Sequence, residues 1–329
     1  VFRSDETRLP TLELKHRVDK RVLDNYFNLF GQKPQWIQCG SQLGGVPQLL
    51  FENWMDRMFL ERLEQRSERI DRLLVESKNH WEYVLFLLLS RSFGLAVNGD
   101  SFFSIAQSIP FAIIRKCRHD LLQIEALLMG QAGLLDQFGG DPYYEEQRKM
   151  YRYLITKYSI SKDSVSRPRF FRLRPNNFPT IRLSQLAVLW HSRTQLFSDI
   201  ISVKHKDECY RLFKITASKY WDTHYNFGVP SAASRKRLTI SFMDLLILNV
   251  IIPLQYCYAR KQGKDSSEEI IGLAMSVKAE KNNVTKRFSA LRKLEGNALE
   301  SQALLQLKNE YCNKRKCMHC AIGNYLLKR

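Results

Sequence analysis

Three cysteines near the end of the chain, Cys312, Cys317 and Cys320, are the residues whose type and spacing best suit chemistry. They follow a Cys-x4-Cys-x2-Cys spacing and surround three consecutive cations at residues 314–316. Thiolates grouped this tightly can bind a soft metal ion, and neighbouring cations would lower the thiol pKa values. The segment is therefore a candidate structural metal site.

Zinc and iron–sulfur clusters are usually held by four protein ligands, so three local cysteines leave one position open. A fourth ligand could come from Cys257, Cys209 or His224, or a water could fill the position, whereas His319 adjoins Cys320 and is poorly placed. Zinc is favoured over an iron–sulfur cluster. In the alternative interpretation no metal binds, and the thiols pack at the end of a helical bundle. A redox role would need a βαβ setting that the sequence lacks.

The second feature is a basic segment. Residues 148–182 hold ten Lys or Arg and one acid, which gives +9, half of the net charge of +18. An arginine guanidinium can bind a phosphate through two parallel hydrogen bonds, and aromatic rings can stack on unpaired bases. Prolines within the segment favour an extended backbone. The residues expected to contact nucleic acid are Arg167, Arg169, Phe170, Phe171, Arg172, Arg174 and Arg182.

An alternative interpretation pairs these arginines inside the protein. Phe171 and Leu173 would then dock on the helices, and some arginines would neutralise buried carboxylates. Glu125 is the candidate partner, because it lies among the apolar residues of its helix. A buried carboxylate needs a partner or stays protonated. On this interpretation the chain is a helical scaffold for a protein partner.

A third hypothesis is a hydrolase or transferase that uses His224. The segment from Tyr220 to Gly228 is rich in aromatic residues, and Asp222 could orient the His224 imidazole as a general base. Such segments are more often buried helix ends. No Ser/His/Asp arrangement and no glycine-rich phosphate loop stands out elsewhere in the sequence.

Composition narrows the class of protein. The pI of about 9.6 points to a polyanionic partner. Seven cysteines, four of them scattered singly, do not form a disulfide framework, and this favours a reducing cytoplasm. The longest apolar run, residues 240–258, is interrupted by Asp244, Asn249 and Pro253, so it predicts a buried core helix and no membrane association.

The hydrophobic spacing is helical almost throughout, which predicts an all-α, multi-helix bundle with at most a small β element at residues 8–14. Asp141-Pro142 starts a helix, Asp100 or Ser101 caps another, and the small residues after Met129 permit a close helix contact. The ranges expected to be helical are 19–30, 46–77, 79–96, 120–129, 141–158, 180–200, 206–220, 238–261, 266–282, 284–294 and 299–311.

The segment at 159–179 is the clearest break in the pattern. We expect an N-terminal helical region at 1–158, an extended arginine- and proline-rich connector at 159–179, and a C-terminal helical region with the cysteines at 180–329. The three could also form one compact unit. The chain begins with Val1 rather than Met, so we expect a piece of a longer protein.

Several segments together resemble a known family. They are residues 125–135, 172–187, 220–225 and the terminal cysteine segment, and they resemble the bacterial domain-of-unknown-function family 2851, common in Bacteroidetes. The resemblance implies no activity. It implies a further N-terminal segment with a Gly-x-Val-Glu-x-His-like stretch, which is loosely similar to metal-dependent nuclease cores. On that reading the present chain is the helical part that binds nucleic acid.

Overall fold

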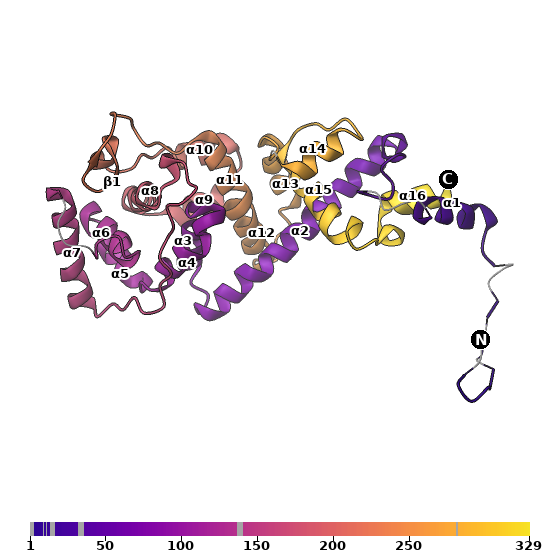
Figure 1. The fold of residues 1–329 in the computed structure, drawn as a ribbon, viewed down its shortest axis with the longest axis horizontal. Helices are drawn as coiled ribbons and strands as arrows, with labels where there is room; N and C mark the ends of the chain where they lie inside the picture. Colours follow the sequence, from indigo (N-terminus) through magenta and orange to yellow (C-terminus); the bar gives the residue numbers. More distant parts are fainter. Residues whose placement is uncertain are drawn as a thin grey trace. The chain divides into compact units, whose positions relative to one another are not determined.

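The computed structural model describes residues 3–8, 10, 12–13, 17–31, 36–136, 141–280 and 282–329. These residues are mostly helical, as the hydrophobic spacing predicts, and the described strands form one two-stranded hairpin (Figure 1). The chain folds into two units. The terminal unit comprises Val1–Arg62 and Lys278–Arg329, and the central unit comprises Leu63–Val277.

The terminal unit is built from both ends of the chain. Helices α1 and α16 pack side by side, and the Asn25 side chain donates to the Leu327 carbonyl over 3.1 Å. The α2 helix supplies residues to both units. The elements of the terminal unit are α1 (Lys20–Phe30), η1 (Leu43–Gly45), the first part of α2 (Gln48–Glu76), α14 (Asn283–Ser289), α15 (Ala298–Gln306), η5 (Leu307–Cys312), η6 (Cys317–His319) and α16 (Ala321–Lys328).

The central unit has helices that are apolar on nearly every side at its core. Its helices are α3 (Trp81–Phe93), α4 (Leu95–Gln107), α5 (Phe111–Cys117), α6 (Leu121–Gln131), α7 (Pro142–Tyr158), α8 (Pro179–Ser192), α9 (Leu196–Ser202), α10 (Lys206–Leu212), α11 (Ile240–Leu246), α12 (Ile252–Lys261) and α13 (Ser267–Ser276). Its shorter elements are η2 (Pro175–Asn177), η3 (Lys219–Asp222), β1 (His224–Asn226), β2 (Val229–Pro230) and the π-helical η4 (Ile247–Ile251). A helix that is apolar all round is stable only when neighbours cover it, and α6 packs against both α7 and α8.

Several helix starts follow from single capping side chains. Asp141 accepts from the Tyr144 N–H over 2.8 Å, with Pro142 at the first position of α7, as the sequence predicts. Asp120 caps α6 in the same way. The predicted cap at Asp100 or Ser101 is wrong, because α4 already begins at Leu95 and both residues lie inside it.

The helical stretch Ile240–Lys261 contains a π-helical turn at Ile247–Ile251, just before Pro253. The wider turn accommodates a proline that lacks the N–H of a regular helix. Within the described residues this is the single helix long and apolar enough to cross a membrane, and 61% of its apolar window is buried in the protein. This burial agrees with the core helix that the sequence predicts.

One predicted boundary differs from the structure, and one predicted strand lies partly outside the described residues. The predicted divider at 159–179 lies inside the central unit, because the two ends of the chain fold together into one unit and do not form separate N-terminal and C-terminal halves. The expected strand at 8–14 falls partly outside the described residues. The observed hairpin, with His224 opposite Pro230 and Gly228 at φ 68° in its turn, was not predicted.

Candidate functional site

The arginine segment between α7 and α8 is held in place by one face of α4. Asn98 donates to the Arg169 carbonyl over 2.8 Å and accepts from its N–H over 2.7 Å. Ser101 donates to the Ser166 carbonyl over 2.6 Å, and Ser104 accepts from the Ser166 N–H. The three α4 residues recur every third position, so they line one helix face. They fix a segment whose backbone has no helix or strand partner of its own.

The exposed arginines of this segment differ in their partners. Arg167 forms an ion pair with Asp136 over 2.5 Å. Arg172 has its guanidinium 5.1 Å from the ring centre of Phe171, which is 76% exposed. No ion pair involves Arg169, Arg172 or Arg174 among the residues that the structure describes. The exposure of Phe171 contradicts the alternative in which this ring docks on the helices.

Arg182, in the first turn of α8, is buried, and it forms no ion pair with any acidic residue that the structure describes. Its side chain donates to Gln185 over 2.9 Å and to Asn177 over 2.6 Å, while its Nε has no hydrogen-bond partner. The guanidinium lies 3.9 Å from the ring centre of Phe242. Burial lowers the pKa of Arg182 to about 10, so the group is still charged at neutral pH. A charge buried in this way normally has a counter-ion.

Arg182 lines an open pocket of about 570 Å³ in the central unit. The other cations on its wall are Arg174, Arg235, Lys236 and Arg237, and amide and hydroxyl side chains complete the polar lining. Among the residues that the structure describes, no carboxylate lines this pocket. The start of α8 adds the positive end of a helix dipole. The pocket therefore has the electrostatics of an anion site, and a phosphate is the anion that arginine forks fit best.

The sequence analysis did not select residues 235–237, although three consecutive cations were a visible signal. The side chain of Lys236 is buried and donates to the Ser234 carbonyl over 2.9 Å. The flanking Arg235 and Arg237 are exposed. This alternation is that of an extended strand, and Arg237 forms a bridge with Thr216. The buried lysine thus fixes the segment while both arginines face outward.

A second cationic pocket of about 590 Å³ adjoins the first, because both are lined by Leu95 and Leu245. It carries Arg66, Arg69 and Arg91, with Asp100 as its acid. Arg91 pairs with Asp100. Burial, together with the charge of Arg91, lowers the pKa of Arg69. The positive surface of the central unit therefore extends beyond one phosphate-sized pocket.

Glu125 does not pair with an arginine, so that part of the scaffold hypothesis is wrong. The Trp221 indole donates to it over 2.8 Å, Ser218 over 3.0 Å and Tyr143 over 2.8 Å. Burial raises the pKa of Glu125, and hydrogen bonds from Ser184 and Trp221 oppose this only in part. The carboxyl is buried, as its place in the sequence predicts, and neutral hydrogen-bond donors stand where an arginine was expected.

Replacing Glu125 by glutamine should flatten the pH dependence of stability. The folded pKa lies above the value of 4.5 expected for the unfolded chain. The unfolded state therefore loses its proton first as pH rises, so wild-type stability falls. Glutamine keeps an acceptor for Trp221 and has no such titration. Urea unfolding at about pH 5 and about pH 8 should show wild type losing stability relative to E125Q. The exposed substitution Glu146→Gln is the control, and an identical pH profile for E125Q and wild type would contradict the prediction.

The three predicted metal-ligating cysteines come together at the end of the terminal unit. Cys312 ends η5, Cys317 begins η6, and Cys320 is the N-cap residue of α16. All three line one small cavity, and Cys39 lines it as well. The sequence analysis missed Cys39, because nothing local connects it with residues 312–320.

The predicted lowering of the thiol pKa values by the loop cations is outweighed by burial. Burial raises the pKa of Cys39 to about 12, and the nearby Cys320 and Cys317 add to the shift. Burial also raises the pKa values of Cys312, Cys317 and Cys320. Arg315 lowers the pKa of Cys317, but by less than burial raises it.

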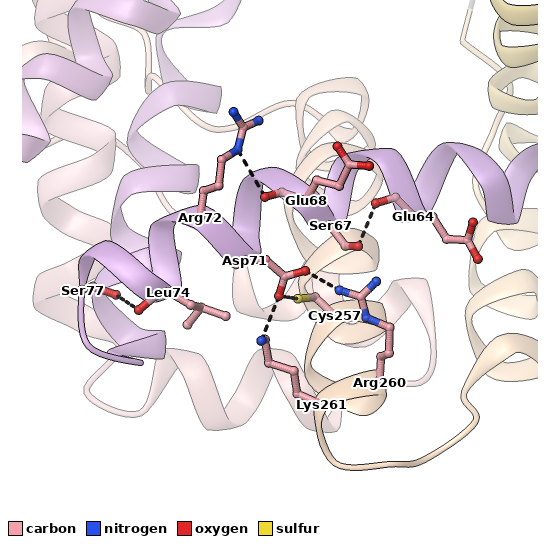
Figure 2. A network of polar contacts seen from close by, with 10 residues as sticks. All are labelled: Glu64, Ser67, Glu68, Asp71, Arg72, Leu74, Ser77, Cys257, Arg260 and Lys261. Carbon is pink, nitrogen blue, oxygen red and sulfur yellow. Dashed lines mark hydrogen bonds and ion pairs between the residues drawn. The ribbon is translucent and has the colours of Figure 1, made fainter.

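The fourth ligands considered from sequence have other roles in the central unit. Figure 2 shows Cys257 beside Asp71, with its sulfur 3.6 Å from a carboxylate oxygen, where Arg260 and Lys261 also bind. Burial alone would raise the pKa of Asp71, but Lys261 and Arg260 hold it below its usual value. Cys209 is fully buried in the core.

His224 lies in β1 with its ring stacked on Tyr220, the ring centres 4.1 Å apart. Its Nδ1 is 3.0 Å from the Thr223 hydroxyl and 3.2 Å from the Tyr220 carbonyl oxygen. These groups, and not Asp222, orient the imidazole. The arrangement therefore differs from the base-and-orienter pair on which the third hypothesis rests.

A family described as "Protein of unknown function (DUF2851)" matches residues 1–283. The match includes Cys39 and every cation of the 570 Å³ pocket but ends before Cys312, so the terminal cysteine segment lies outside it. No curated protein and no solved structure matches the chain.

Proposed function

The chain belongs to the DUF2851 family of proteins of unknown function, so a function can be inferred only from the geometry of the candidate site. We propose that the protein binds nucleic acid through its phosphates. The observation that carries this proposal is the buried guanidinium of Arg182, which pairs with no described carboxylate. It lines a pocket in which the described residues supply five cations and no acid. A bound phosphate would supply the missing counter-ion and an acceptor for the free Nε.

A polyanion fits this surface better than a single small anion. Arg174 joins the pocket to the exposed Arg172 and Phe171 two and three residues earlier, and the second cationic pocket shares lining residues with the first. Successive phosphates could occupy the cationic positions, while Phe171 offers an uncovered ring for an unpaired base. The lining consists of arginine, lysine, amide and hydroxyl groups, which support binding and not a particular reaction.

The alternative functions have less support from the described residues. The scaffold alternative loses its predicted partner for the arginines at Glu125, although Arg167 does pair internally with Asp136. If the protein were the helical part of a metal-dependent nuclease, the catalytic carboxylates would come from outside the present sequence. A cytoplasmic location would suit the scattered free cysteines.

The affinity for nucleic acid should depend on salt concentration as expected for phosphate contacts. We expect labelled single-stranded and double-stranded oligonucleotides to bind at about 50 mM salt, and log K to fall linearly with log salt. Arg174→Ala and Arg237→Ala should each reduce that slope by about 0.7–0.9, the value for one lost phosphate contact. Fluorescence anisotropy measures both quantities.

The control is Arg115→Ala, which removes an exposed charge on α5 outside both pockets. It should leave the slope unchanged. Absence of binding at low salt would refute the proposal, and an equal effect of Arg115→Ala would show that only the overall charge matters.

A further inference from the structure

We propose that Cys39, Cys312, Cys317 and Cys320 form a four-thiolate site for a single zinc-class ion in the terminal unit. The carrying observation is that all four line one cavity of about 20 Å³, although Cys39 is separated from the others by more than two-thirds of the chain. Four is the ligand number of structural zinc sites, and thiolates are the preferred donors. The fourth ligand that the local spacing lacks is therefore Cys39.

The cavity volume favours one ion over a cluster. A site needs about 10–15 Å³ to hold one water-sized sphere, so this cavity has room for about one. No group of three or more His, Cys, Asp or Glu side chains in the described part of the chain could hold a metal as it stands. Metal binding would therefore draw the four sulfurs inward by rotation about their Cα–Cβ bonds. Each thiol gives its proton to water as its sulfur binds, so no oxidant is required.

The backbone around the cysteines is packed to bring them together. A Cβ on Gly323 would lie 2.1 Å from the Cys317 carbonyl oxygen, so a glycine is needed where η6 meets α16. The N–H groups of Ile322 and Gly323, in the first turn of α16, point to the Cys320 sulfur. Backbone donors of this kind orient metal-bound thiolates in many sites.

A buried hydrogen-bond donor beside the site also lacks an acceptor. The indole of Trp54 lies beside the Cys320 sulfur and is 5% exposed, and its Nε1 has no hydrogen-bond partner. A metal-bound thiolate is a better acceptor than a neutral thiol. The exposed cations of residues 314–316 would offset the negative charge of four thiolates around a divalent ion.

Cobalt(II) substitution tests the proposal, because sulfur-to-cobalt absorption reports both the number of thiolates and the affinity. The full chain, reduced and kept anaerobic, should bind one Co²⁺ that Zn²⁺ displaces. Cys39→Ala should lower the affinity at least about tenfold and reduce the charge-transfer intensity. Cys209→Ala, which removes a buried thiol of the central unit, should match wild type.

Three outcomes would overturn the proposal. They are an unchanged cobalt spectrum and affinity in Cys39→Ala, a folded wild type that binds neither ion, and a purified protein that contains iron and sulfide. If Cys39→Ala does not fold, alkylation of the wild type decides. Zinc should protect Cys39, Cys312, Cys317 and Cys320 together from N-ethylmaleimide, and an unchanged rate at Cys39 would refute its role.

Discussion

Replacing Arg182 by methionine should greatly weaken phosphate binding while the protein stays folded. Methionine has a similar length and can keep the contact with Phe242. The loss removes hydrogen bonds of a charged donor, each contributing about 1.5–3 kcal/mol, so oligonucleotide affinity should fall at least about tenfold. Removing this charge should weaken binding more than removing any exposed arginine, because a buried charge is less screened by water.

Two opposing effects keep the unfolding free energy of this variant near that of wild type. Burial of an unpaired guanidinium is costly, so its removal stabilises the fold. However, the buried Gln185 side-chain oxygen loses its donor, which costs about 1–3 kcal/mol. A purely structural Arg182 would instead cause a large loss of stability without a separate loss of binding.

Thermal unfolding with inorganic phosphate separates these interpretations. A ligand at one hundred times its Kd stabilises the folded state by about 2.7 kcal/mol. Phosphate should therefore raise the Tm of wild type and of the control Arg115→Met, and leave that of Arg182→Met unchanged. An equal rise in all three proteins would show that phosphate acts elsewhere, and the proposed function would lose its main support.

Local signals in the sequence predict local structure well in this chain. The starts of α6 and α7 follow from Asp120 and Asp141, whose side chains cap the helix that they precede. The start of α4 was not predictable in this way, because it begins directly after α3 without a capping side chain. Ser101, which has the right chemistry for a cap, instead donates to the Ser166 carbonyl.

The sites depend on contacts between distant segments, and only parts of them were predictable. Arg174 and Arg182 were expected to bind phosphate, but their pocket is completed by residues 235–237, which a bridge to Thr216 positions. Likewise Cys39 reaches the cavity of Cys312 only because the two ends of the chain fold into one unit. Periodicity carries no information on such pairings.

Gly130 lies at the close helix contact that the sequence predicted, and substituting it should strongly destabilise the central unit. A Cβ at this position of α6 would lie 2.2 Å from ring atoms of Tyr151 on α7. Tyr151 is 6% exposed and cannot turn freely into solvent. Overpacking of a core costs about 1–3 kcal/mol and occasionally more. This outweighs the gain of about 1 kcal/mol that alanine brings to a helix interior.

Gly272→Ala is the matched control, because this glycine of α13 has open space where the Cβ would be. Chemical denaturation should show Gly130→Ala destabilised and Gly272→Ala stabilised, the latter by about 0.5–1 kcal/mol. In a Tyr151→Ala background the added methyl group has room, so Gly130→Ala should then cost little. An unchanged cost in that background would mean that the ring of Tyr151 is not what requires a glycine at residue 130.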